Sequence, residues 1–285
     1  MPNPTQLKAN KFRAADSVIT HPVRAKFYPT TSGIPRLAQV QKFATAHFRE
    51  DGWEAIDRAD RKSLNVVDVA AEIVDGDHVP TEADVRRATR RAKINAFDLI
   101  MCNHDLDTFV TFTYSPDEVD DKASYDECYE SIAVWLSNRV QRRGLKYVMV
   151  PERTKRGDIH FHAIMNSVAL KFTPALSAKS GRVLTHNGKP LWNVPDWKFG
   201  FTSAEHIGVS DGDRAAVAKY IFKYMGKQMG QKIGGRYVLT GGKLARPLYA
   251  YGDSEYEFFS PEEAKDVRVV DVVEAGISYW EYSFI

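Results

Sequence analysis

Two histidines and one glutamate are spaced so that a β-hairpin would bring them together. His160 and His162 are one residue apart, and side chains at positions i and i+2 of a strand point to the same face of a sheet. Residues 145–152 and the segment around the histidines are strand candidates, and Thr154–Asp158 indicates the turn between them. In a symmetric hairpin Glu152 lies opposite His160. A lone His-x-His pair is more often structural or solvent-facing, but Glu152 at the matching position favours a metal site.

Such a site would leave coordination positions open for a substrate oxygen. Two imidazoles and one carboxylate suit a catalytic divalent cation, Mg²⁺ or Mn²⁺, better than structural Zn²⁺. The cation would bind and polarise a phosphate oxygen.

Two tyrosines one helical turn apart form a second candidate group. Tyr220 and Tyr224 lie in residues 215–227, which contain strong helix formers and follow possible N-cap residues. Tyrosines at this spacing usually pack against a sheet. A free phenol has a pKa near 10, so a nucleophilic phenol needs positive charge nearby. Three lysines on an adjacent stripe of the predicted helix could provide it: Lys219, Lys223 and Lys227.

The elements around these groups predict an α+β fold. A strand at Thr108–Tyr114 and an amphipathic helix at Ser124–Arg143 precede the hairpin. A loop at 171–196, with Asn187-Gly188 as a turn signal, and a strand at Gly200–Ile207 precede the tyrosine helix. This order predicts a central antiparallel β-sheet with helices on one face.

At these residues the chain resembles the rolling-circle replication initiators of the HUH endonuclease superfamily, in the two-tyrosine, phage-type branch. The second motif of that family is His-apolar-His, and its third motif, Y-U-x-K-Y-U-x-K with U apolar, matches Tyr220–Lys227. The first motif, an apolar strand rich in threonine, resembles Phe109–Tyr114. The resemblance covers roughly residues 85–250. It implies an RRM- or ferredoxin-like nuclease domain.

The resemblance also implies an activity. The protein would nick and rejoin single-stranded or extruded origin DNA by metal-assisted transesterification, with Glu152, His160 and His162 as metal ligands. Tyr224 would attack first, Tyr220 would serve the later strand transfer, and the intermediate would be a 5′-phosphotyrosine. Lys223 and Lys227 would stabilise phenolate or phosphate charge, or contact the DNA backbone. Because the chain has no G-x-x-x-x-G-K-[S/T] loop, a host helicase and replication machinery are expected partners.

Two other functions fit part of the pattern. A sequence-specific DNA-binding protein could keep the sheet and the basic segments without catalysis. An HUH transposase or relaxase would also use histidines and a tyrosine. Transposases usually have one tyrosine and a shorter chain, and relaxases use a third histidine and an N-terminal tyrosine that have no matching residues here.

Composition sets the broad limits. The 285 residues are 44% hydrophobic with a net charge of +2, and neither a signal peptide nor an apolar span of membrane length is evident, so we expect a cytoplasmic protein of a bacterial or other prokaryotic host. The cysteines Cys102 and Cys128 are expected to be reduced. Basic stretches at 86–93 and 139–156 border the predicted site, and we expect them to contact phosphates.

We expect three parts along the chain. Residues 1–80 form a mostly helical N-terminal extension, with short helices at Phe43–Trp53 and Val66–Ile73 and a mobile start at Met1–Phe12. Its role is open between origin binding, dimerisation and packing. Residues 81–252 form the HUH endonuclease domain, and residues 253–285 form an acidic C-terminal segment.

Overall fold

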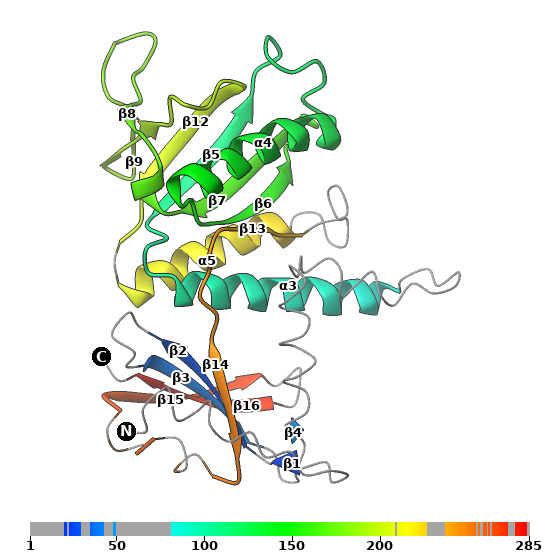
Figure 1. Ribbon diagram of the computed structural model, residues 1–285, viewed down its shortest axis with the longest axis vertical. Helices are drawn as coiled ribbons and strands as arrows, with labels where there is room; N and C mark the ends of the chain where they lie inside the picture. The colour runs from blue at the N-terminus through cyan, green and yellow to red at the C-terminus, as the bar shows by residue number, and fades with distance from the viewer. Residues whose placement is uncertain are drawn as a thin grey trace. The chain divides into compact units, whose positions relative to one another are not determined.

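The chain folds into two compact units, which are described separately. One comprises residues 65–245 and the other residues 1–64 together with residues 246–285. The computed structural model (Figure 1) describes residues 20–21, 23–29, 35–42, 48–49, 81–208, 210–226, 237–254, 256, 259–260, 262, 264–272 and 277–283. No helix within these ranges is long and apolar enough to cross a membrane.

A seven-stranded antiparallel sheet forms the centre of the first unit (Figure 1). The strand order is β13-β6-β7-β5-β12-β11-β8. Every neighbouring pair is antiparallel. The strands are β5 (Thr108–Tyr114), β6 (Tyr147–Arg153), β7 (Ile159–Met165), β8 (Thr173–Pro174), β11 (Trp192–Asn193), β12 (Gly200–His206) and β13 (Leu239–Gly241).

Three α-helices accompany this sheet, each begun by a side-chain cap. α3 (Glu82–Cys102) starts with a capping box between Thr81 and Asp84, and α4 (Tyr125–Arg143) starts at Ser124 and ends at Gly144, which has a φ of 66°. α5 (Asp211–Gly226) follows Ser210, whose hydroxyl accepts from the Asp213 backbone N–H at 3.1 Å. These caps are the sequence signals that begin helices. A short 3₁₀ helix, η1 (Ser167–Ala169), follows β7.

The helices lie on both faces of the sheet, whereas we expected them on one. Residues such as Phe112 and Phe161 pack with Trp135 of α4 on one face. On the other face Val148, Val150 and Ile164 pack with α3 and α5. The reason lies in β6 and β7, which are buried on both faces along most of their length. Their apolar runs are nearly continuous, as in strands covered on both sides. The antiparallel sheet and the α+β class are confirmed.

The second unit contains a five-stranded antiparallel sheet of order β14-β2-β3-β16-β15. Strands β2 and β3 come from the N-terminal part of the chain, and β14, β15 and β16 from its C-terminal part. We expected these two parts to be separate from each other. Valine and alanine alternate with polar residues in β2, so one face packs with Phe259 and Tyr282. The strands are β2 (Val23–Pro29), β3 (Pro35–Lys42), β14 (Leu248–Gly252), β15 (Asp266–Val272) and β16 (Ile277–Ser283).

The expectation of a mostly helical N-terminal extension was wrong for its described part. Residues 23–29 and 35–42 are strands, because their apolar residues recur at every second position. Part of the helix predicted at Phe43–Trp53 is strand β4 (Phe48–Arg49), which pairs with β1 (Thr20–His21). The rest of that segment, Val66–Ile73 and Met1–Phe12 lie outside the described residues.

Candidate metal and tyrosine site

The β6–β7 hairpin brings the two histidines and the glutamate together. Its register pairs Glu152 with His160, which confirms the predicted alignment. One potential ligand atom from each of Glu152, His160 and His162 lies within 4.8 Å of the others, and this is the one such group of three among the described histidines, cysteines and acids. The hairpin closes through a turn in which the Thr154 N–H donates to the Asp158 carbonyl at 2.8 Å.

Burial and hydrogen bonds fix the His162 ring. Its Nε2 lies 2.7 Å from Oε2 of Glu152, and its Nδ1 lies 3.0 Å from Oγ1 of Thr111. Thr111 stands opposite His162 on β5. A hydroxyl both donates and accepts, so Thr111 can hydrogen-bond to the Nδ1 atom in either tautomer of the ring. Thr111 was not predicted as a site residue, although residues 111 and 113 share one face of the threonine-rich strand at 108–114.

The three side chains fit a divalent cation. Two imidazole nitrogens and one carboxylate oxygen lie within 4.8 Å of one another, and such donors could ligate one divalent cation and leave its other positions open. Burial and the neighbouring His162 hold the pKa of His160 below its ordinary value of 6.5, so this ring is neutral and able to ligate at neutral pH.

The start of α5 is anchored by a buried arginine. Arg214 is 3% exposed, and its guanidinium donates to the carbonyls of Asn103 at 3.1 Å and of Leu106 at 3.3 Å, and to that of His104. These carbonyls belong to the link between α3 and β5. The anchor therefore sets α5 against the sheet that carries the histidines.

Anchored in this way, α5 places both tyrosines at the histidine cluster. The ring of Tyr224 stacks on that of His162 with centroids 3.8 Å apart and an interplanar angle of 15°. The Tyr224 hydroxyl donates to the Tyr220 hydroxyl at 2.6 Å. Tyr224 is buried, whereas Tyr220 is 44% exposed and packs edge-on against Phe109.

The surroundings raise the pKa of Tyr224 above its ordinary value. The main cause is burial, followed by the hydrogen bond with Tyr220 and the charge of Glu152. We expected the lysines of the helix to lower this pKa. Burial and the neighbouring oxygen atoms outweigh them, and both Lys219 and Lys223 are exposed. Lys227 lies outside the described residues.

The basic stretch at 139–156 is partly engaged within the fold, and its expected contacts with phosphates stay a prediction. Helix α4 lies on the sheet face away from the histidines, so its arginines are not beside the cluster. Lys155 and Arg156 stay exposed in the hairpin turn next to Glu152. Four cations have internal partners: Arg139 and Arg143 with Asp196, Lys146 with Asp105, and Arg153 with the carbonyls of Ala123 and Gly157.

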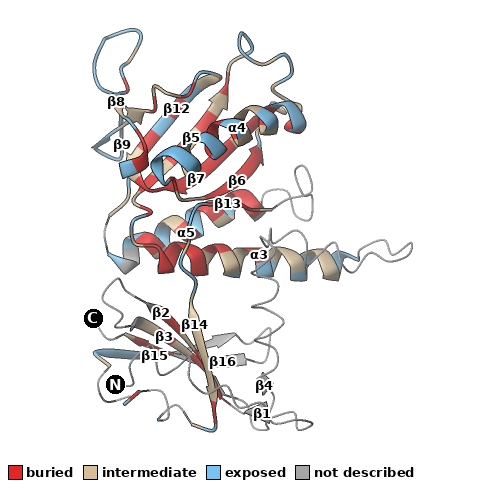
Figure 2. Ribbon diagram, viewed as in Figure 1, coloured by how far each residue is buried: buried red, intermediate tan, exposed pale blue. Residues whose placement is uncertain are grey.

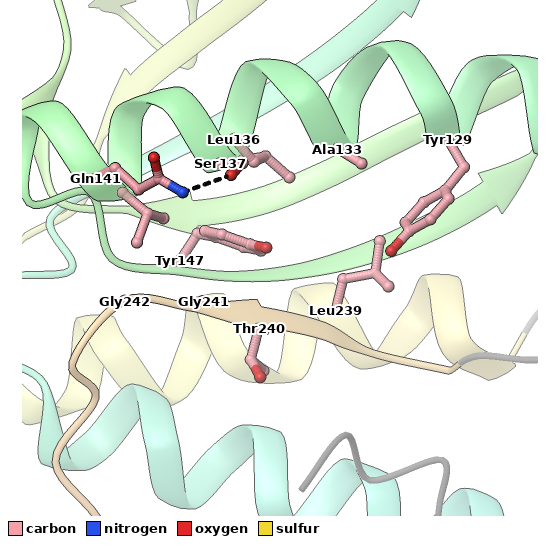
Figure 3. Close-up of a pocket in the computed structure, with 11 residues that line it drawn as sticks. Tyr129, Ala133, Leu136, Ser137, Gln141, Tyr147, Leu239, Thr240, Gly241 and Gly242 are labelled. Carbon is pink, nitrogen blue, oxygen red and sulfur yellow. Dashed lines mark hydrogen bonds between the residues drawn. The ribbon is translucent and has the colours of Figure 1, made fainter. Parts of the chain in front are cut away.

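A cavity of about 280 Å³ lies elsewhere, between α4 and β13 (Figure 3). Tyr129 and Tyr147 border it, and Gly241 lets the Tyr147 ring pack closely against the strand, because a Cβ there would lie 2.3 Å from that ring. Of its lining strand residues, Tyr147 and Leu239 pack in the core under α4, whereas Glu152 and the histidines share the sheet face of Val150 and Ile164, which α3 and α5 cover. The cavity is therefore not part of the candidate site.

Residues 107–229 match the family model of the replication-associated proteins ORF2/G2P. The matched segment runs from the start of β5 to the end of α5, so it contains the histidines, Glu152 and both tyrosines. The match supports a replication initiator that acts on DNA. Neither the curated proteins nor the solved structures contain a match.

Proposed function

We propose that this protein is a rolling-circle initiator that nicks and rejoins single-stranded origin DNA through a phosphotyrosine intermediate. One observation carries the proposal: the Tyr224 ring stacks on His162, within a cluster that has the donor set of a divalent cation. A phenol and a cation site on adjacent elements are the two parts that such a reaction needs.

In the proposed reaction the Tyr224 hydroxyl oxygen attacks the scissile phosphorus in line. The bond from phosphorus to the 3′ oxygen breaks, and a proton replaces phosphorus on that oxygen. The phenol proton first has the Tyr220 hydroxyl as its acceptor. A divalent cation on Glu152, His160 and His162 would polarise the phosphate and offset the Glu152 charge that raises the Tyr224 pKa.

The products account for the second tyrosine. DNA remains joined to Tyr224 through its 5′ phosphate, and the free 3′ hydroxyl primes synthesis. One phosphodiester replaces another, so the step reverses without ATP. Tyr220, which is more exposed, would cleave the regenerated origin while Tyr224 still holds the first end. Lys223 and Lys227 would contact phosphates, and a host helicase would unwind the duplex.

A covalent adduct tests the proposal. The protein is incubated with single-stranded origin DNA and Mn²⁺, and the products are separated under denaturing conditions. We expect an adduct that His160→Ala and His162→Ala abolish while DNA binding persists, because affinity comes mainly from cations. When Mg²⁺ replaces Mn²⁺, Glu152→Ala should lose the adduct, and Mn²⁺, which tolerates mixed oxygen and nitrogen ligands, should restore part of it.

His206→Ala is the matched control, since His206 lies on the opposite face and contacts Thr108. It should form the adduct normally. Cleavage at the wild-type rate in EDTA would refute the metal-assisted reaction. Binding without any adduct would instead favour a DNA-binding protein that lacks catalysis.

A further inference from the structure

The sheet face that carries the histidines is covered only in part. Helices α3 and α5 pack over β6 and β7. Farther across the sheet, Thr111 and Thr113 of β5 are half-buried, and Phe201 and Ser203 of β12 are exposed on the same face. The face therefore continues from the cluster onto an accessible surface of β5 and β12, which is called the sheet floor below.

An exposed phenylalanine lies in register with the cluster. Glu152 pairs with His160, His160 with Thr113, and Thr113 with Phe201, so four directly opposed residues form one row across β6, β7, β5 and β12. Strands are about 4.8 Å apart, which places the Phe201 backbone about 10 Å from that of His160. Phe201 is 72% exposed. A flat aromatic ring is therefore open to solvent on the same row of residues as Glu152 and His160.

The backbone at Phe201 is held closely against β5. Gly200, with a φ of 150°, lies so close that a Cβ atom would come 2.3 Å from the Thr113 carbonyl oxygen. Only glycine permits this approach and this φ. The register of β12, and with it the position of Phe201, is fixed at this point.

A basic loop borders the sheet floor. Residues 171–198 contain a hairpin of β9 (Thr185–His186) and β10 (Lys189–Pro190), with Asn187 at a φ of 49° in its turn. His186 Nδ1 lies 2.8 Å from Oε2 of Glu205, which follows Phe201 and Ser203 on the same face of β12. The loop is largely exposed (Figure 2). Its five cations are Lys171, Lys179, Arg182, Lys189 and Lys198, and its one acid, Asp196, is paired with Arg143.

We propose that Phe201 is a stacking platform for an unpaired base of the DNA strand, next to the phosphate held at the histidine cluster. This rests on the proposed function and names how its substrate is recognised. The flat ring supplies a surface for any base, and the loop cations supply charge complementary to the backbone. A duplex does not expose a base face to such a ring, so the platform selects single strands.

The test measures binding without catalysis. A fluorescent single-stranded oligothymidylate is titrated with protein in EDTA, and 2-aminopurine is moved along the strand to report stacking. We expect Phe201→Ala to weaken binding about 5- to 150-fold and to relieve quenching at one strand position. Phe201→Trp should restore both. Phe201→Leu, apolar but without a π face, should restore neither.

Val134→Ala is the control, because Val134 is an exposed apolar residue of α4 on the other side of the sheet. Unchanged affinity and quenching in Phe201→Ala would overturn the platform, as would full rescue by Phe201→Leu. A wild-type dimer that is lost in Phe201→Ala and kept in Val134→Ala would also overturn it. The result is independent of nicking. If the wild type forms no adduct but binding depends on Phe201, the proposed function fails and the platform stands.

Discussion

The Tyr224 ring and the His162 ring lie face to face, 3.8 Å apart. The contact joins helix α5 to strand β7, so the proposed nucleophile and a proposed ligand form one packed unit. A shift of either ring would move the other. The position of the phenol thus depends on the residues that hold His162, above all Glu152 and Thr111.

The two phenols should differ in their roles. Tyr224→Phe keeps the stacking on His162 but removes the hydroxyl, so we expect a strong loss of first cleavage of an origin oligonucleotide. Tyr220→Phe should mainly impair the later strand transfer, and the double variant should form no adduct. Mass spectrometry of the trapped peptide measures this directly. A nucleotide attached to a residue outside α5 would contradict the assignment.

The short-range part of the site could be predicted from sequence. The pairing of Glu152 with His160 follows from a two-residue strand period and one turn, and the tyrosine helix follows from its formers and its cap at Ser210. These features depend on neighbours along the chain. The stacking of Tyr224 on His162 does not, because it requires α5 to be anchored by Arg214 to the link before β5.

The parts that were missed depend on contacts between distant residues. Glu281 accepts a hydrogen bond from Gln39, which is 242 positions away, and no local pattern indicates that pairing. The second helical layer was missed although a signal existed. Val148, Met149 and Val150 are all apolar, and such a run indicates a strand buried on both faces.

Thr111 should act as a positioning residue for the metal site. Outer hydrogen-bond partners of ligating histidines typically change metal affinity 10- to 100-fold when lost, so we expect a loss of about that size in Thr111→Val. Thr111→Ser keeps the hydroxyl and is the matched control. Calorimetric titration of Mn²⁺ without DNA measures the affinity. Equal affinity in the valine and serine variants would rule out the role.

His160 should stay neutral down to a pH below that of a free histidine. Its pKa lies below the ordinary 6.5, so we expect this ring to take up a proton only in solution more acid than about pH 6.5. The same depressed pKa makes the folded state lose stability as the pH falls below 6.5, because the unfolded chain binds the proton first. Proton NMR of the metal-free protein measures the titration, and protonation of the His160 ring at or above pH 6.5 would contradict its burial.

Arg214 should contribute strongly to stability. Arg214→Met keeps the aliphatic stem but removes the donor that the guanidinium supplies to three carbonyls, and we expect a loss of about 2–4 kcal/mol in the free energy of unfolding. Urea denaturation measures it. Arg142→Met, at an exposed position of α4, is the control and should change stability by no more than about 0.5 kcal/mol. A similarly small effect at Arg214 would mean that the anchor is dispensable.

The basic loop should determine part of the salt dependence of DNA binding. Each phosphate contact on a single strand contributes about 0.7 to the slope of log affinity against log salt concentration, so Lys179→Gln with Arg182→Gln should reduce the slope by up to about 1.4. Arg142→Gln, on the opposite side of the sheet, should leave it unchanged. Fluorescence anisotropy over a salt series gives both slopes. The loop variant could keep the wild-type slope while Phe201→Ala still weakens binding. In that case the DNA strand crosses β12 without contacting the loop. Its phosphates are then contacted by other cations, such as Lys155 and Arg156 in the hairpin turn.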